Sequence, residues 1–223
     1  MIVAIDGPAG AGKSTVARRL AKALGYVYLD TGAMYRAVAW ALRQAHLKAA
    51  DEMQIARTLE DLPLHFTIAD GELVIFYQGK SLNDELRDPE VTQMASHISQ
   101  IQAVRTLLAQ RQRRLADQEN VVTEGRDVTT VVFPAARIKV FLTADMSTRA
   151  ERRQLEYRRK GLDIDYSLLF EQIRTRDEAD RQRSLSPLRP APDALYLDTS
   201  LMDPGEVVSR LLDFIRNTGN RET

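Results

Sequence analysis

The sequence contains no cysteine, which excludes disulfide bonds and thiolate metal sites and fits a reducing compartment. It also has no net charge, because 31 Lys and Arg residues balance 31 Asp and Glu residues. A balanced charge gives no sign of binding to nucleic acid or to an anionic membrane, so we expect a small-molecule partner. No stretch reaches the roughly 18 consecutive apolar residues of a membrane helix, and Met1–Asp6 lacks the basic leader of a signal or transit peptide. We therefore expect a cytoplasmic protein that does not bind membranes.

The chain has 223 residues, of which 44% are hydrophobic, enough for one substantial core. We expect a single domain and a monomer. Five short β-rich runs alternate with stretches of helical character, which indicates an α/β fold with a five-stranded, mostly parallel sheet covered by helices on both faces. The five runs are Ile2–Asp6, Tyr26–Asp30, Asn120–Thr123, Ile138–Thr143 and Ala194–Asp198.

The segment Leu64–Leu82 interrupts this alternation. Its two apolar runs flank Asp70-Gly71, a pair typical of a tight type I′ turn, so we expect a small antiparallel insert. Asp88-Pro89 then marks the start of a helix, and a second, basic helix follows it. Residues 146–183 are polar and helical in pattern, and acidic neighbours make a solvated, salt-bridged helical pair the ordinary interpretation for most of their arginines.

A glycine-rich loop follows the first strand. The run Gly7–Ser14 satisfies the pattern G-x-x-x-x-G-K-[ST], and the first helix is expected to begin at Ser14 and to stop at Gly25. Glycines let successive backbone N–H groups point into one concavity, and the positive end of the following helix also favours a phosphate there. We predict nucleotide binding by Gly7, Pro8, Ala9, Gly10, Ala11, Gly12, Lys13, Ser14 and Thr15.

Two side chains of this loop carry the chemistry. Lys13 adds a mobile charge that can follow a transferred phosphoryl group, and the Ser14 hydroxyl suits a Mg²⁺ ion that bridges the β- and γ-phosphates of ATP. A turn that only joins a strand to a helix would need neither. On the loop alone a motor ATPase or a GTPase stays open, but the guanine-reading tetrapeptide Asn-Lys-x-Asp is absent. Glu124, after the third strand, could hold a metal-bound water or could pair with Arg126.

Two further polar segments follow strands at the edge where open α/β sheets bind ligands. After the second strand, Thr31 and Arg36 stand near the start of a helix; a helix cap would explain Thr31 but not Arg36. After the third strand comes Glu124-Gly125-Arg126-Asp127, whose charges we expect to line a cleft.

Taken in order, these segments resemble bacterial cytidylate kinases, which belong to the nucleoside monophosphate kinase group. The resemblance covers nearly the whole chain, and its more specific parts are the Gly-Arg-Asp segment and the antiparallel insert, because the loop alone would be weak evidence. It is carried by Ile5–Thr15, Leu29–Arg36, Gly125–Asp127, Thr130–Pro134, Arg176-Asp177 and Asp180–Arg183.

The resemblance implies a P-loop kinase that transfers the γ-phosphoryl group of ATP to CMP, and also to dCMP, with the help of Mg²⁺. It divides the chain into a core (about 1–61, 99–145 and 192–217), a monophosphate-binding insert (about 62–98) and a helical lid (about 146–191). Catalysis would rest on Lys13, Arg126, Arg176 and Arg183. The acceptor nucleotide would contact Thr31, Arg36, Ser96, Arg105, Arg126, Asp127, Arg176, Asp180 and Arg183.

The chemistry of three of these residues suits cytosine. Asp127 can accept a hydrogen bond from the exocyclic amine, while Ser96 and Arg105 can donate to N3 and O2. Uracil has a carbonyl in place of the amine, and unmade polar contacts in a buried site can cost roughly 10⁴ in discrimination. Ordinary roles stay open as well: Ser96 as a helix-surface hydroxyl, Arg105 as a solvated cation and Asp127 as a helix cap.

The implied lid residues have a regular spacing. Arg176, Asp180 and Arg183 are separated by four and three positions, so we expect all three on one face of a helix, with Asp180 at a ribose hydroxyl and Arg183 at a phosphate. The chain departs from the family at Thr129, where a glycine is usual. Because threonine does not easily take positive φ, the path of the loop after Asp127 is not predicted.

Rival interpretations come from three classes. Another small acceptor, such as UMP, dTMP or shikimate, would suit the same loop, and a regulatory switch would hydrolyse ATP or GTP without an acceptor. A nucleic-acid-binding role has the basic helix around residues 105–114 in its favour and the balanced charge against it. The histidines His46, His65 and His97 lack metal-ligand spacing, and we assign them no chemistry.

Overall fold

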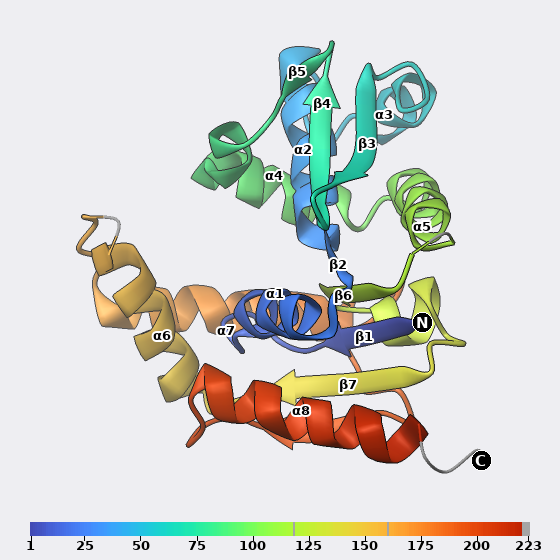
Figure 1. Cartoon of the computed structure of the whole chain (residues 1–223). Coiled ribbons are helices and arrows are strands. Elements are labelled where there is room, and N and C mark those ends of the chain that lie inside the picture. Colours follow the sequence, from blue (N-terminus) through green and yellow to red (C-terminus); the bar gives the residue numbers. More distant parts are fainter. Residues whose placement is uncertain (118, 160, 220–223) are drawn as a thin grey trace. The chain divides into compact units, whose positions relative to one another are not determined.

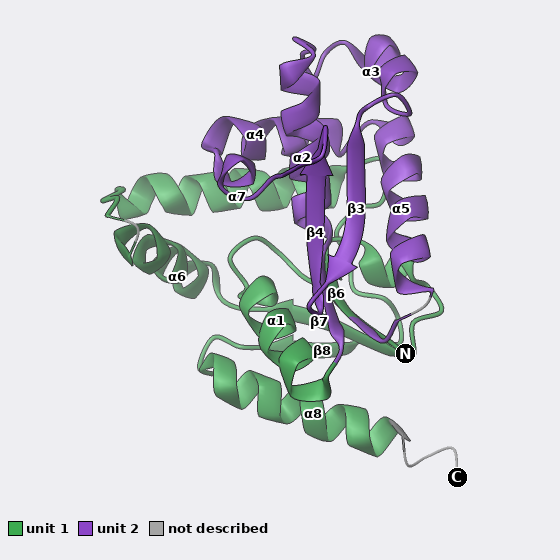
Figure 2. Ribbon diagram, turned by 45° about the horizontal axis from the view of Figure 1, so that its top comes forward, with its two compact units in different colours: residues 1–25, 122–223 green, residues 26–121 purple. Residues whose placement is uncertain are grey.

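Two units make up the fold, and each contains its own strands and helices (Figure 2). The computed structural model describes residues 1–117, 119–159 and 161–219. One unit comprises residues 1–25 and 122–223, and the other comprises residues 26–121. Within the described residues, every helix is too short or too polar to cross a membrane.

The first unit is built on a sheet with the strand order β6-β1-β7-β8. β1 pairs in parallel with β7, where Val3 lies opposite Ile138, and β7 pairs in parallel with β8. Most apolar side chains of β1, β6 and β7 are buried, as expected for a parallel sheet covered by helices, whereas β8 at the edge exposes Tyr196. The strands are β1 (Ile2–Asp6), β6 (Val121–Gly125), β7 (Ile138–Thr143) and β8 (Leu195–Asp198), which confirms four of the five predicted runs.

The helices of this unit cover the sheet. The first helix buries Val16, Ala17 and Leu20 on one face, and it stops at Gly25, whose φ of 66° is left-handed. It packs against the C-terminal helix, and Figure 1 shows both on the near side of the strands. The helical pair predicted within residues 146–183 is also present and packs together. The elements are α1 (Lys13–Leu24), the π-helical turn η2 (Val128–Val132), α6 (Met146–Arg159), α7 (Tyr166–Gln182) and α8 (Pro204–Gly219).

The second unit holds the remaining predicted strand, β2 (Val27–Asp30), and the antiparallel insert. β3 (Leu64–Ala69) and β4 (Glu72–Tyr77) form the predicted hairpin, and both turn residues take positive φ, 52° at Asp70 and 75° at Gly71. β4 also pairs in parallel with β2, with Tyr28 opposite Glu72, a pairing that the sequence did not predict. A short strand, β5 (Lys80–Ser81), pairs antiparallel with the end of β4, with Lys80 opposite Tyr77.

Helices surround this small sheet. The Asp88 side chain caps the predicted helix by accepting hydrogen bonds from the N–H groups of Glu90 and Val91. The ring of Trp40 meets that of Tyr77 edge-on, with centroids 4.9 Å apart, which fastens a helix to the hairpin. The helical elements are α2 (Thr31–Gln44), α3 (Glu52–Thr58), η1 (Asp84–Arg87), α4 (Pro89–Ile98) and α5 (Gln102–Ala116).

Candidate active site

The glycine-rich loop joins β1 to α1 in the first unit. Gly10 and Gly12 have φ values of 75° and 85°, which favour glycine. Gly7 is required for a different reason, because a Cβ atom there would lie 1.9 Å from the backbone oxygen of Leu142. The helix begins at Lys13, one residue earlier than predicted. The glycines of the motif are therefore needed by the local geometry.

The Lys13 side chain is buried beside this loop. Its Nζ donates a hydrogen bond of 2.8 Å to the backbone oxygen of Pro8. The pKa of Lys13 is lowered to about 7, first because burial removes water from the cation and then because Arg126 and Arg176 repel it, while Glu124 and Asp6 act in the opposite direction. A phosphate group beside Nζ would supply the opposite charge that this ammonium group needs.

Ser14 and Glu124 lie side by side. The Ser14 hydroxyl donates to Glu124 Oε1 at 2.8 Å, and the carboxylate is buried at the end of β6. A hydroxyl and a carboxylate oxygen are the ligands that Mg²⁺ prefers. In the described residues no cluster of three or more His, Asp or Glu could hold a metal by itself. A Mg²⁺ ion that keeps waters and phosphate oxygens needs only one or two protein ligands, so this pair fits the ion.

Asp180 interacts with three arginines, Arg126, Arg176 and Arg183. Its carboxylate accepts from Arg126 Nε at 2.8 Å and from Arg183 Nη2. Burial would raise the pKa of Asp180, but attraction to Arg126, Arg183 and Arg176 outweighs burial and lowers it. Burial likewise opposes the charge of Arg126, yet its pKa is raised, mainly by Asp180. The four residues predicted to be catalytic, Lys13, Arg126, Arg176 and Arg183, therefore belong to one network of charges.

The prediction of a single helical face for the lid residues is wrong in one respect. α7 ends at Gln182, and Arg183 follows it with an extended backbone, φ −54° and ψ 132°. The helix closes there because the Leu188 N–H donates to the backbone oxygen of Asp180 at 2.8 Å. Arg183 reaches Asp180 from outside the helix, and only Arg176 and Asp180 share the face.

A buried ion pair that was not predicted from the sequence holds the phosphate loop. Arg149 Nη1 donates to Asp177 Oδ2 at 2.6 Å and to the backbone oxygen of Ala9 at 2.8 Å. The Ala9 N–H in turn donates to Asp177 Oδ1 at 3.1 Å. Asp177 belongs to the segment Arg176-Asp177, which is one of those that carry the family resemblance, and this could have marked it as a functional residue. Arg149 could not be told from the neighbouring arginines by sequence.

Asp6 ties the end of β1 to the segment after Asp127. It accepts from the N–H groups of Val128 and Thr129, at 2.9 and 2.8 Å, and from the Thr129 hydroxyl at 2.6 Å. Thr129 lies in η2 without positive φ, so threonine is accommodated there and the path of this loop is now defined. Asp127 precedes that turn, but its side chain makes no capping hydrogen bond, so its interpretation as a cap is wrong.

The remaining predicted residues belong to the second unit. Asp30, not Thr31, caps α2, since its Oδ1 accepts from the Ala33 N–H at 2.7 Å. Thr31 is the buried first residue of that helix. Arg36 extends from α2 back to Asp30 Oδ2, at 3.3 Å. The cap interpretation of Thr31 is therefore wrong, and Arg36 is held partly exposed at the carboxyl end of β2.

Ser96 and Arg105 both lie near the junction of α4 and α5. Arg105 is only 6% exposed and donates from Nη1 to the backbone oxygen of Ser99 at 3.0 Å, so its interpretation as a solvated cation is wrong. The Ser99 hydroxyl donates to the backbone oxygen of Ser96 at 2.7 Å. Ser96 is half-buried on α4. Ser96 and Arg105 are therefore linked through Ser99, which accepts from Arg105 and donates to the backbone of Ser96.

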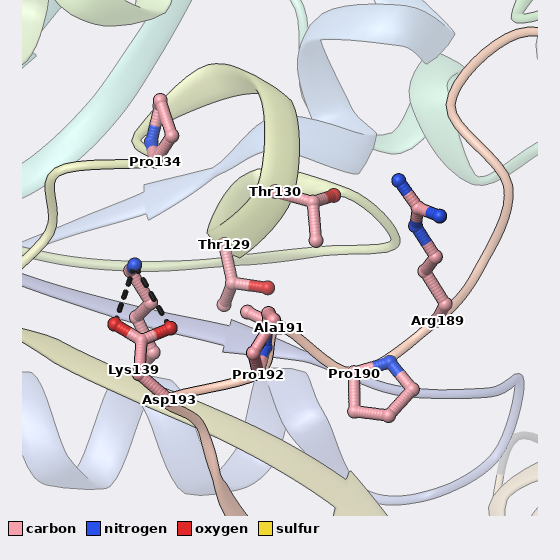
Figure 3. A pocket seen from close by; sticks show the side chains of 9 residues that line it. All are labelled: Thr129, Thr130, Pro134, Lys139, Arg189, Pro190, Ala191, Pro192 and Asp193. Atoms are coloured by element: carbon pink, nitrogen blue, oxygen red, sulfur yellow. Dashed lines mark hydrogen bonds and ion pairs between the residues drawn. The ribbon is translucent and has the colours of Figure 1, made fainter.

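A separate pocket of about 390 Å³ opens beside η2 (Figure 3). Lys139 crosses part of its wall and bonds to Asp193, with Nζ 2.8 Å from Oδ2. None of its lining residues was predicted to bind substrate. They are Thr129, Thr130, Pro134, Lys139, Arg189, Pro190, Ala191, Pro192 and Asp193.

Comparisons with known proteins show what the chain is similar to. The sequence profile of the family described as cytidylate kinase matches residues 3–217. A cytidylate kinase of Carboxydothermus hydrogenoformans is 44% identical over 96% of this chain and 97% of its own, and one of Caldicellulosiruptor bescii is 42% identical over 95% and 93%. Among solved structures, an uncharacterized protein of Eubacterium ventriosum has a TM-score of 0.55 and 14% identity, covering 97% of this chain and 98% of its own. That last likeness concerns the fold alone.

Proposed function

The chain belongs to the cytidylate kinase family, whose members are phosphotransferases, and we propose that it transfers the γ-phosphoryl group of ATP to CMP, and also to dCMP, giving ADP and the diphosphate. The observation that carries this proposal is the charge network beside the phosphate loop. Arg126 and Arg176 lower the pKa of Lys13, and the same two arginines together with Arg183 lower the pKa of Asp180. Such a concentration of cations suits a reaction in which several phosphate charges must be neutralised.

The nucleophile in this reaction is an oxygen of the acceptor phosphate, which is already ionised. No general base is needed, so rate enhancement rests on positioning and charge neutralisation by Lys13, Arg126, Arg176 and Arg183. Ser14 and Glu124 would hold Mg²⁺. The ion, when bound, supplies further neutralisation of the phosphate charge.

Acceptor recognition is proposed for residues of both units. In the first, Asp127 accepts from the cytosine amine, Asp180 accepts from a ribose hydroxyl, and the arginines take phosphate oxygens through charge-assisted hydrogen bonds. For the second unit, we propose that Thr31, Arg36, Ser96 and Arg105 bind the acceptor nucleotide. The burial of Asp127 and Arg105 supports roles in which polar contacts discriminate between bases.

Lid behaviour follows from the same chemistry. Arginines on and after α7 would exclude water once they meet phosphate, so closure should require both substrates and should limit wasteful hydrolysis. The division into core, insert and lid stays a prediction. That the enzyme is a monomer and that it lies in the cytoplasm also stay predictions.

A coupled assay of ADP release tests the proposal. CMP and dCMP are expected to be phosphorylated efficiently, and UMP, AMP and shikimate poorly. ATP turnover that is equally fast without any acceptor would instead favour a hydrolytic switch. Asp127→Asn is expected to weaken the preference for CMP over UMP, because an amide can donate to the uracil carbonyl. An unchanged preference in this variant would contradict the proposed mode of base recognition.

A further inference from the structure

The carboxylate of Asp6 receives three hydrogen bonds from one short segment. The N–H groups of Val128 and Thr129 donate at 2.9 and 2.8 Å, and the Thr129 hydroxyl donates at 2.6 Å, the shortest of the three. Asp6 and Thr129 are both fully buried, at 0% and 1% exposed. In such a dry environment each of these hydrogen bonds is costly to lose.

This contact joins two parts of the proposed site. Asp6 is the last residue of β1 and immediately precedes the phosphate loop. Arg126 and Asp127 immediately precede Val128, whose N–H is bound to Asp6. We propose that Thr129 is a positioning residue: its hydroxyl completes a three-donor shell around Asp6 that holds Arg126 and Asp127 at a fixed place beside the phosphate loop. The kinetic part of this inference rests on the proposed function.

The protonation of Asp6 bears on the strength of this shell. Burial raises the pKa of Asp6 to about 6, and the hydroxyl bond from Thr129 is the largest of the influences that lower it. Two neighbouring charges act on Asp6 electrostatically: Asp127 raises its pKa, and the Lys13 cation is attracted to it. Without the hydroxyl, more Asp6 is protonated near neutral pH, and a protonated oxygen is a poor acceptor for the two N–H groups.

The neighbouring threonine provides a matched control. Thr129 and Thr130 are consecutive residues of η2, and both line the pocket beside that turn (Figure 3). The Thr130 hydroxyl is directed to the backbone oxygen of Asp127 at 3.5 Å, a weak contact, and not to Asp6. A change from threonine to valine therefore removes the hydroxyl bond to Asp6 at one position and not at the other.

The test compares Thr129→Val, Thr129→Ser and Thr130→Val with the wild-type chain. Titration of the Asp6 carboxyl carbon by NMR, between about pH 4 and pH 9, reports the hydrogen bond without any need for activity. Thr129→Val is expected to raise the Asp6 midpoint by about one pH unit, and the other two variants are expected to leave it nearly unchanged. Thermal melting of each variant at neutral pH checks that it is folded.

Steady-state kinetics then test the positioning. Thr129→Val is expected to raise KM for CMP about fivefold at pH 7 and to change KM for ATP much less, with partial recovery at alkaline pH as Asp6 ionises. Thr129→Ser should retain the wild-type values. An unmoved Asp6 midpoint in Thr129→Val overturns the inference, as does a raised midpoint with KM for CMP unchanged, or a serine variant that behaves like valine. If the wild-type chain does not phosphorylate CMP, the proposed function fails, while the carboxyl titration still decides the role of the hydroxyl.

Discussion

Arg149 and Asp177 form a buried ion pair, with Nη1 and Oδ2 2.6 Å apart, and together they hold Ala9 of the phosphate loop. Asp177 accepts from the Ala9 N–H, and Arg149 donates to the Ala9 carbonyl oxygen. One residue of the loop is thus bound at its donor and its acceptor by side chains from α6 and α7. Because Arg176 and Asp180 also belong to α7, the loop and part of the predicted lid share one anchor.

Removing the acid of this pair should be strongly destabilising. Asp177→Ala leaves the Arg149 guanidinium, 3% exposed, without its carboxylate, and the expected loss in the free energy of unfolding is about 3–5 kcal/mol, measured by urea denaturation. Glu171→Ala on the same helix breaks an exposed ion pair with Arg174 and should cost much less. Equal losses in the two variants would show that Asp177 has no special structural role.

Changing the carboxylate beside Ser14 should alter the response to Mg²⁺. Glu124→Gln removes the negative charge next to the Ser14 hydroxyl and is expected to raise the Mg²⁺ concentration for half-maximal activity about 10- to 100-fold. The measurement is a Mg²⁺ titration of ADP release at saturating ATP and CMP. Glu178→Gln, an exposed change on α7, serves as the control and should leave the titration unchanged.

Two glycines of the first unit should respond very differently to alanine. In Gly7→Ala the new Cβ would lie 1.9 Å from the backbone oxygen of Leu142, which no side-chain movement can relieve, so we expect loss of the folded loop and of ATP binding. Gly25→Ala meets no atom within 4 Å and bears only the strain of its φ of 66°, about 1–2 kcal/mol. Thermal melting and nucleotide binding of both variants check this contrast, and similar behaviour would contradict it.

The stability of the protein should depend on Asp6 between about pH 4 and pH 6. The folded pKa of about 6 lies above the usual value of 3.8, so the folded state binds this proton more tightly than the unfolded state. The stability that Asp6 contributes is therefore fully present below pH 3.8 and is lost as the pH rises through about 6. Denaturation of the wild-type chain and of Asp6→Asn across this range gives their free energies of unfolding. The wild-type value minus the Asp6→Asn value should fall by about 2–3 kcal/mol as the pH rises. A constant difference would mean that Asp6 titrates normally.

Local signals in the sequence were sufficient for the secondary structure near the site. The hairpin turn at Asp70-Gly71 and the helix start at Asp88-Pro89 were predicted because each depends on the conformation of a few adjacent residues. The end of α7 was misplaced because a spacing of three and four positions says nothing about where a helix stops. Leu188 closes that helix end from beyond it, through a contact that no periodicity reveals.

The phosphate loop, the alternation of strands and helices, and the family could all be predicted without a structure, because they depend on short motifs and on apolar periodicity. The pairing of each acid with its hydrogen-bond donor depends on folding, because Ser14 and Glu124 are 110 positions apart and Asp6 and Thr129 are 123 apart. Along the chain one buried carboxylate looks like any exposed one. Their roles differ because folding places some of them where water is excluded and where a particular hydroxyl, N–H group or guanidinium must replace it.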